Sequence, residues 1–132
     1  MKTVSQPYRG PKLREKKSIF IATIYPVANK KEIDTRLAEI REEFDDASHN
    51  AYAYRFMRDG LPVADRDDDG EVPNTAGQPI LNILGKNDLI NVLLIVTRYY
   101  GGINLGRGGL LRNYSGTALD LIDNIPLLEF TH

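Results

Sequence analysis

The sequence predicts an α+β fold, a two-layer sandwich whose elements follow the order β-α-β-β-α-β-α. Two observations predict this class. Apolar segments of strand length alternate with amphipathic segments of helical period, and a glycine-rich turn connects the last strand to the last helix. With 132 residues the chain is long enough to bury a core, and we expect one domain over residues 18–132. Residues 1–17 are polar and basic, and we expect them to form a flexible arm.

The first strand and the first helix show two different periods. Residues 18–25 are mostly β-branched or aromatic, which is typical of a buried strand, and Pro26 ends it. Asn29 and Glu32 have the spacing of a capping box, so we expect a helix to begin there. Its apolar positions recur every three or four residues, at Ile33, Leu37, Ile40 and Phe44.

The middle of the chain predicts a hairpin followed by an acidic loop. Residues 51–57 alternate, with three aromatic side chains on one side of the strand. Asp59 and Gly60 form a hairpin turn signal, so a short strand over residues 61–64 is expected to pair back. Residues 65–74 then form a loop rich in aspartate.

Two helices and one strand complete the predicted fold. Asn74 or Thr75 is expected to cap the second helix, which contains Pro79 in its first turn. A buried strand follows over residues 91–98, and the last helix is expected over residues 109–123.

Composition limits the classes of function. The formal net charge is −1, so nucleic acid would have to be bound by a local basic patch rather than by the whole molecule. Because the chain has no cysteine, a disulfide framework and thiolate metal sites are excluded. The N-terminus lacks the apolar run of a signal peptide, and no segment has the length of a membrane span, so we expect a cytoplasmic protein without a membrane partner.

The candidate site is the glycine- and arginine-rich segment over residues 96–114. Glycines let backbone N–H groups approach a ligand, and the first turn of a helix leaves N–H groups free to bind an anion. The glycine spacing fits neither a dinucleotide fingerprint nor a phosphate-binding P-loop. The residues expected to bind an anion or RNA are Arg98, Gly101, Gly102, Gly106, Arg107, Gly108, Gly109 and Arg112.

A second group of polar residues is expected beside this segment. His49 and Asn50 are interpreted as a structural pair at the entry to a strand. The acidic run resembles the first half of a calcium loop, but Ala76 stands where a bidentate glutamate is needed. We therefore predict no metal site, no cofactor and no catalytic residue. The expected neighbours of the site are His49, Asn50, Tyr54, Arg55, Asp68, Asp69, Glu71 and Thr75.

Four segments together resemble the Impact/YigZ family. They are K-K-S-I-F-I-A (residues 16–22), D-A-S-H-N-A-Y-A-Y-R (46–55), D-D-G-E-V-P-N-T-A-G-Q-P (68–79) and residues 96–114. The resemblance covers the N-terminal Impact domain, without the C-terminal ferredoxin-like domain of many bacterial relatives. It implies the α+β fold of domain IV of elongation factor G. It also implies a role in translation, because eukaryotic members regulate translation by binding the large activator of the amino-acid-starvation kinase.

The acidic loop departs from the family pattern at one point. Glu71 is followed by Val72, Pro73 and Asn74, so the proline is displaced by one place and asparagine replaces a glycine. Asparagine is among the residues that best tolerate a positive φ, and we expect the turn to survive.

Three functions remain open from the sequence. The first is a non-enzymatic binding module in translation or its regulation, which contacts RNA or a ribosome-associated protein through the glycine- and arginine-rich loop. The second is a small phosphate- or nucleotide-binding enzyme in which Asp68, Asp69 and Glu71 hold a metal or act as acid and base. It requires the acidic loop and the glycine turn to face one cleft. The third is an adaptor that contacts protein only. The sequence does not determine the oligomeric state.

Overall fold

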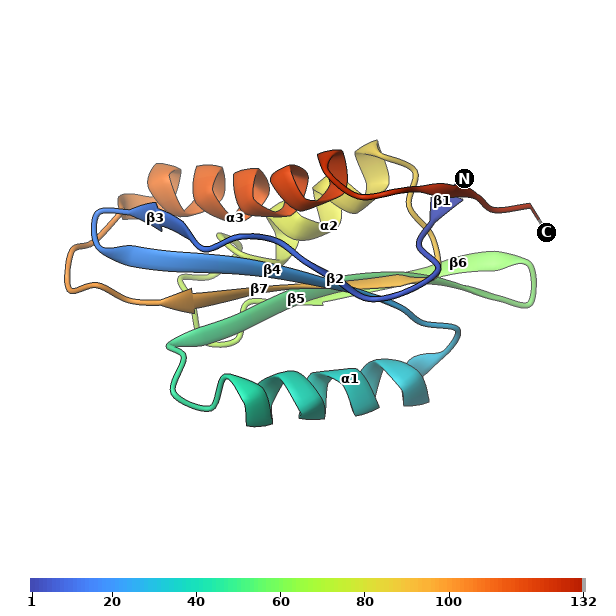
Figure 1. Cartoon of the computed structure of the whole chain (residues 1–132), viewed down its shortest axis with the longest axis horizontal. Coiled ribbons are helices and arrows are strands. Elements are labelled where there is room, and N and C mark those ends of the chain that lie inside the picture. Colours follow the sequence, from blue (N-terminus) through green and yellow to red (C-terminus); the bar gives the residue numbers. More distant parts are fainter. Residues whose placement is uncertain (132) are drawn as a thin grey trace.

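The computed structural model describes residues 1–131, so the last residue of the expected domain, His132, lies outside the described residues. Its main sheet has six antiparallel strands in the order β2-β4-β7-β5-β6, with β3 also paired to β4 (Figure 1). The strands are β2 (Tyr8–Arg9), β3 (Leu13–Glu15), β4 (Ser18–Pro26), β5 (His49–Arg58), β6 (Leu61–Asp67) and β7 (Val92–Tyr99). A separate pair joins β1 (Lys2–Thr3) to β8 (Leu128–Glu129).

Three helices cover this sheet. Helices α2 (Gly77–Lys86) and α3 (Gly106–Asp123) pack on one face and form the larger core, whereas α1 (Lys30–Glu43) covers the opposite face (Figure 1). The α+β class is confirmed, as is the element order from β4 to α3. None of these helices, within residues 1–131, is long and apolar enough to cross a bilayer.

The central strand β7 is buried from both sides. Val92, Leu94 and Val96 belong to the core under α2 and α3, and Leu93 and Ile95 belong to the core under α1. Since successive side chains of a strand point to opposite faces, a strand covered on both faces reads as one continuous apolar run. That burial fixes the end of β7, from which the candidate site extends.

Residues 1–17 are not a flexible arm, contrary to the prediction from sequence. Tyr8 and Arg9 pair with β4, and residues 13–15 pair with residues 18–20 of the same strand. Strands of two or three residues are too short to show the two-residue period by which a strand is recognised in a sequence. In addition, charged residues are common on edge strands, and the sequence does not distinguish them from the solvated charges of a loop. The correction matters because it fixes the turn that contains Lys16 and Lys17 at the edge of the sheet.

Two local predictions are confirmed and one changes in extent. The side chain of Asn29 accepts a hydrogen bond from the backbone N–H of Glu32 at 2.9 Å, so it caps α1. Asp59 and Gly60 both have positive φ, as a tight hairpin turn requires. Strand β6 continues to Asp67, three residues beyond the predicted end, and brings the acidic loop close to the start of α2.

Candidate functional site

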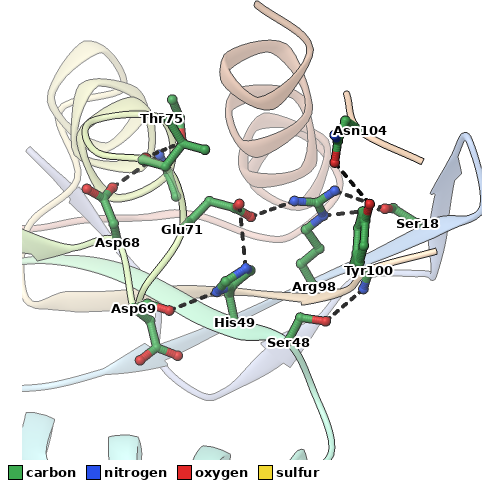
Figure 2. A network of polar contacts seen from close by, with 12 residues as sticks. Ser18, Ser48, His49, Asp68, Asp69, Glu71, Thr75, Arg98, Tyr100 and Asn104 are labelled. Atoms are coloured by element: carbon green, nitrogen blue, oxygen red, sulfur yellow. Dashed lines mark hydrogen bonds and ion pairs between the residues drawn. The ribbon is translucent and has the colours of Figure 1, made fainter. Parts of the chain in front are cut away.

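An ion pair buried at the end of β7 organises the site. Arg98 has only 4% of its surface exposed, and its Nη1 donates to Oε2 of Glu71 at 2.8 Å (Figure 2). The hydroxyl of Tyr114 in α3 donates to the same oxygen at 2.6 Å. On the other side, Nη2 of Arg98 donates to Oγ of Ser18 at 3.1 Å. The guanidinium therefore connects the acidic loop and β4, while Glu71 adds the link to α3.

The electrostatics of this cluster favour the ionised form of Glu71. Burial by itself would raise the pKa of the carboxyl, but hydrogen bonds from Tyr114 and Arg98, with the charges nearby, hold that pKa below its ordinary value. Burial and the hydrogen bond to this carboxylate raise the pKa of Tyr114. At neutral pH the cluster is consequently a carboxylate held by a guanidinium and a neutral phenol.

Arg98 also lies between two aromatic rings. Its guanidinium carbon is 5.6 Å from the ring centre of Phe20 and 5.3 Å from that of Tyr100. Tyr100 is 48% exposed, and its hydroxyl donates to Oδ1 of Asn104 at 2.9 Å. Arg98 therefore holds an exposed aromatic ring in place and does not itself face solvent, although the sequence predicted it as a ligand-binding cation.

His49 and Asn50 hold the acidic loop against β5. Nδ1 of His49 is 2.9 Å from the carbonyl oxygen of Asp69, and since a carbonyl only accepts, Nδ1 carries the hydrogen. Nε2 of the same ring is 3.5 Å from Oε1 of Glu71 (Figure 2). The backbone N–H of Asn50 donates to Oδ2 of Asp69 at 2.6 Å, and its side chain accepts from Thr97. The contacts of this pair are with the loop and the sheet.

Asp68 caps helix α2 in place of the predicted Asn74 or Thr75. Its Oδ1 accepts from the backbone N–H of Gly77 at 2.9 Å and of Ala76 at 3.2 Å, and its Oδ2 accepts from that of Asn74 at 2.8 Å. The carboxylate is thereby placed at the positive end of the helix, where a negative charge is stabilising. Asn74 instead has a φ of 65°, so the asparagine at this point of the loop keeps the turn as expected.

The acidic loop and the glycine-rich turn face one cleft of about 310 Å³. Arg107 connects the two sides, because its Nη1 donates to the carbonyl oxygen of Pro73 at 3.1 Å. Glu71 is the acidic residue of the loop that lines the cleft, since the carboxylates of Asp68 and Asp69 accept backbone hydrogen bonds. Among residues 1–131, no group of three or more acidic or histidine side chains is arranged to hold a metal ion.

The glycines of the turn have two structural roles. A Cβ atom at Gly101 would lie 2.1 Å from the carbonyl oxygen of Lys17, so the chain can pass the β3–β4 turn only with glycine. Gly102 and Gly106 have φ values of 88° and 73°, which side chains other than glycine rarely adopt. Gly108 and Gly109 lie in the first turn of α3. Close packing and turn geometry therefore account for part of the pattern that the sequence assigned to a ligand.

Helix α3 begins without a side-chain cap, unlike α1 and α2. Leu105 stands at its N-cap, no side chain within residues 1–131 forms a capping hydrogen bond there, and the first turn contains no acidic residue. Arg107 is exposed in that turn, and Nη1 of Arg112 lies 3.2 Å from the position of a Cβ at Gly108. Both arginines thus add positive charge where the helix dipole is already positive.

The structure groups most of the expected site residues but not all of them. Arg98, Gly106, Arg107 and Glu71 line one cleft. Tyr54 and Arg55 lie elsewhere, because residue 55 pairs with Val92 at the far end of β7. Tyr54 is packed in the core under α1, and Arg55 donates to the carbonyl oxygen of Leu89. Tyr54, which the sequence predicted beside the site, therefore packs in the core instead.

Three residues of the site were not found from the sequence. Tyr114 was assigned to the apolar face of the last helix, and its hydroxyl gave no signal of its bond to Glu71. Ser18 starts a strand, and nothing near it in sequence indicates its contact with Arg98. The sequence predicts Lys16 within a flexible arm, whereas the structure shows that it lines a pocket of about 210 Å³ together with Arg112.

Comparisons with known proteins identify the family and the fold of the chain. The Impact N-terminal domain family matches residues 16–122. An IMPACT family member of Thermus thermophilus is 41% identical over 83% of this chain and 58% of the relative. The crystal structure of a hypothetical protein superposes with a TM-score of 0.87 and 29% identity, over 96% of this chain and 62% of that chain. The two-domain translational regulator Yih1 shares the fold at a TM-score of 0.52 and 23% identity, over 90% and 45% of the two chains. The chain spans little more than half the length of the bacterial relatives it matches, and less than half that of the eukaryotic ones.

Proposed function

Because the chain belongs to the Impact family, we propose that it is a non-enzymatic binding module that acts in translational regulation. The family match supports this role, and so does the shared fold with Yih1, which is described as a translational regulator. The proposed partner is RNA or a ribosome-associated protein in the cytoplasm. Either would present phosphate or carboxylate groups to the module.

The proposed contact is the loop that precedes α3. The observation that carries it is the uncapped start of α3, which has two arginines beside it, whereas side-chain oxygens cap α1 and α2. Free N–H groups and a positive dipole end favour an anion at this position. Arg107 and Arg112 are the exposed cations of the segment, whereas Arg98 is occupied by Glu71 and Ser18.

Reversing the charge of both exposed arginines tests this proposal. We expect R107E/R112E to weaken association with purified ribosomes about tenfold or more, because each charge-assisted hydrogen bond contributes about 1.5–3 kcal/mol. Co-sedimentation over a range of salt concentrations measures the effect. The control is K31E/R41E, which makes the same change of charge at exposed positions on α1. An affinity and salt dependence equal to those of the control would contradict the proposed contact.

The shared cleft supports a second candidate, a phosphate- or nucleotide-binding enzyme. Glu71 and Gly106 line that cleft together, as such an enzyme requires. In this candidate Arg107 would contact the phosphate, whereas Glu71 would be a weak base, because its pKa is lowered and Arg98 and Tyr114 hold its carboxylate. Calorimetric titration with nucleotides separates the two candidates. The enzyme would be favoured if the wild-type protein bound a nucleotide saturably, lost that binding in R107E and did not associate with ribosomes.

A further inference from the structure

We infer that the partner is single-stranded RNA and that it binds across two segments, the β3–β4 turn and the loop before α3. The exposed cations Lys16 and Lys17 of that turn, together with Arg107 and Arg112 of α3, which follows the loop, are called here the basic end. The inference rests on the proposed function and adds both the chemical class of the partner and the second half of its binding surface.

The two segments of the basic end are in direct contact. The backbone of Gly101 passes so close to Lys17 that a Cβ atom would overlap its carbonyl group. Lys16 and Arg112, which are far apart in sequence, line the same pocket beside Leu105. The β3–β4 turn and the loop from β7 to α3 accordingly lie at the same end of the molecule in Figure 1. Leu105 also lines the larger cleft, so pocket and cleft adjoin.

The charges of the basic end are available to a partner. None of its four cations forms a salt bridge within the part of the chain that the structure describes. Arg107 donates one hydrogen bond to the carbonyl oxygen of Pro73, and Glu15 lines the pocket as the nearby acidic side chain. With a net charge of −1 over the whole chain, four such cations at one end make a local patch that attracts a polyanion.

The exposed aromatic ring beside the basic end favours a single strand. Tyr100 is held by Asn104 and by the guanidinium of Arg98, yet nearly half of its surface is exposed. Ile103 in the same loop is 41% exposed. Proteins that bind single strands combine cations along the backbone with aromatic rings on which unpaired bases stack. A duplex offers phosphates but no unstacked base, and an acidic protein surface offers neither phosphate nor base.

Binding of a labelled oligouridylate of about 12 nucleotides, within the usual site size, tests the inference by fluorescence anisotropy. We expect K16E/K17E to weaken binding about tenfold and to reduce the salt slope by about 0.7 for each lost phosphate contact. Y100A should weaken binding about fivefold or more through lost stacking. E15Q should tighten binding, whereas K31E/R41E on α1 should leave it unchanged. A matched duplex should bind more weakly than the single strand.

The outcomes separate this inference from the proposed function. If R107E/R112E weakens ribosome association but K16E/K17E behaves as K31E/R41E does, the two-segment surface is wrong and the proposed contact stands. If the wild-type protein binds ribosomes in a nuclease-resistant manner and does not bind the oligouridylate, the partner is a protein and the inference is overturned. Equal affinity for duplex and single strand would also overturn it. Thermal melting of each variant shows that lost binding does not arise from unfolding.

Discussion

Replacing Glu71 by alanine is expected to lower the free energy of unfolding by about 3–5 kcal/mol at neutral pH, because it leaves the buried guanidinium of Arg98 without its carboxylate. Tyr114 loses its hydrogen-bond acceptor at the same time. Urea unfolding followed by circular dichroism measures the loss. The matched control is D65A, at an exposed carboxylate of β6 whose salt bridge with Arg66 lies at the surface. The free energy of unfolding of D65A should differ from that of the wild type by no more than about 1 kcal/mol.

The acid dependence of stability provides the second readout for Glu71. The pKa of Glu71 is lowered in the folded protein, whereas the same carboxyl should have a pKa of about 4.3 in the unfolded chain. The stabilising contribution is therefore complete above that value and is lost as the pH falls through the lower folded pKa. Glu71→Gln has no titrating group at this position, so its stability should fall less steeply with acid than that of the wild type. If the stabilities of the wild type and of Glu71→Gln fell equally with acid, the charge of the Glu71 carboxylate would contribute nothing to stability.

Substituting alanine for Gly101 is expected to destabilise the protein by at least about 3 kcal/mol, at the upper end of overpacking effects. The new Cβ would lie 2.1 Å from the oxygen and 2.2 Å from the carbon of the Lys17 carbonyl, and backbone atoms cannot move aside as a flexible side chain can. Differential scanning calorimetry measures the loss.

Gly116 of α3 provides a matched control for this substitution. A Cβ atom there meets nothing within 4 Å, and the residue is exposed within the helix. G116A should therefore stabilise the protein by about 1 kcal/mol, because alanine favours the helix. If G101A were as stable as G116A, the close contact between the β3–β4 turn and the loop before α3 would be wrong.

Much of the fold follows from local patterns in the sequence. Most of the apolar run of β4, the run of β7 from Val92 to Val96 and the apolar positions of α1 lie in the core. The alternation in β5 places Tyr52, Tyr54 and Phe56 toward α1, whereas Ala51 and Ala53 lie toward α2 and α3. These features were predictable because burial of one face imposes its period directly on the residues.

The site depended on contacts between residues that are distant in sequence. Arg98 and Glu71 are 27 residues apart, and a buried arginine needs such a partner because an uncompensated buried charge is strongly destabilising. From the sequence alone, Arg98 lies at the end of a strand and directly before a glycine-rich turn, where an exposed cation is expected. The same applies to Lys16, whose position beside Arg112 depends on pairing of β3 with β4 rather than on any local period.

The buried and exposed arginines therefore have separate roles. Arg98 fixes the acidic loop and the ring of Tyr100, and this rigid base positions the loop that leads into the first turn of α3, where Arg107 lies. Rigid elements that hold a binding loop reduce the ordering entropy that a partner must overcome. Variants of Arg98 should consequently affect stability first, and variants of the basic end should affect binding alone.

Ultraviolet crosslinking of ribosome-bound protein, followed by mass spectrometry of the peptides that carry nucleotide adducts, shows where RNA lies on the molecule. We expect adducts at Tyr100 and within residues 101–112, with further adducts at Lys16 or Lys17 and none on α1. Adducts confined to α1 or to the exposed edge of β6, or crosslinks to ribosomal proteins without any nucleotide adduct, would contradict RNA binding at the basic end.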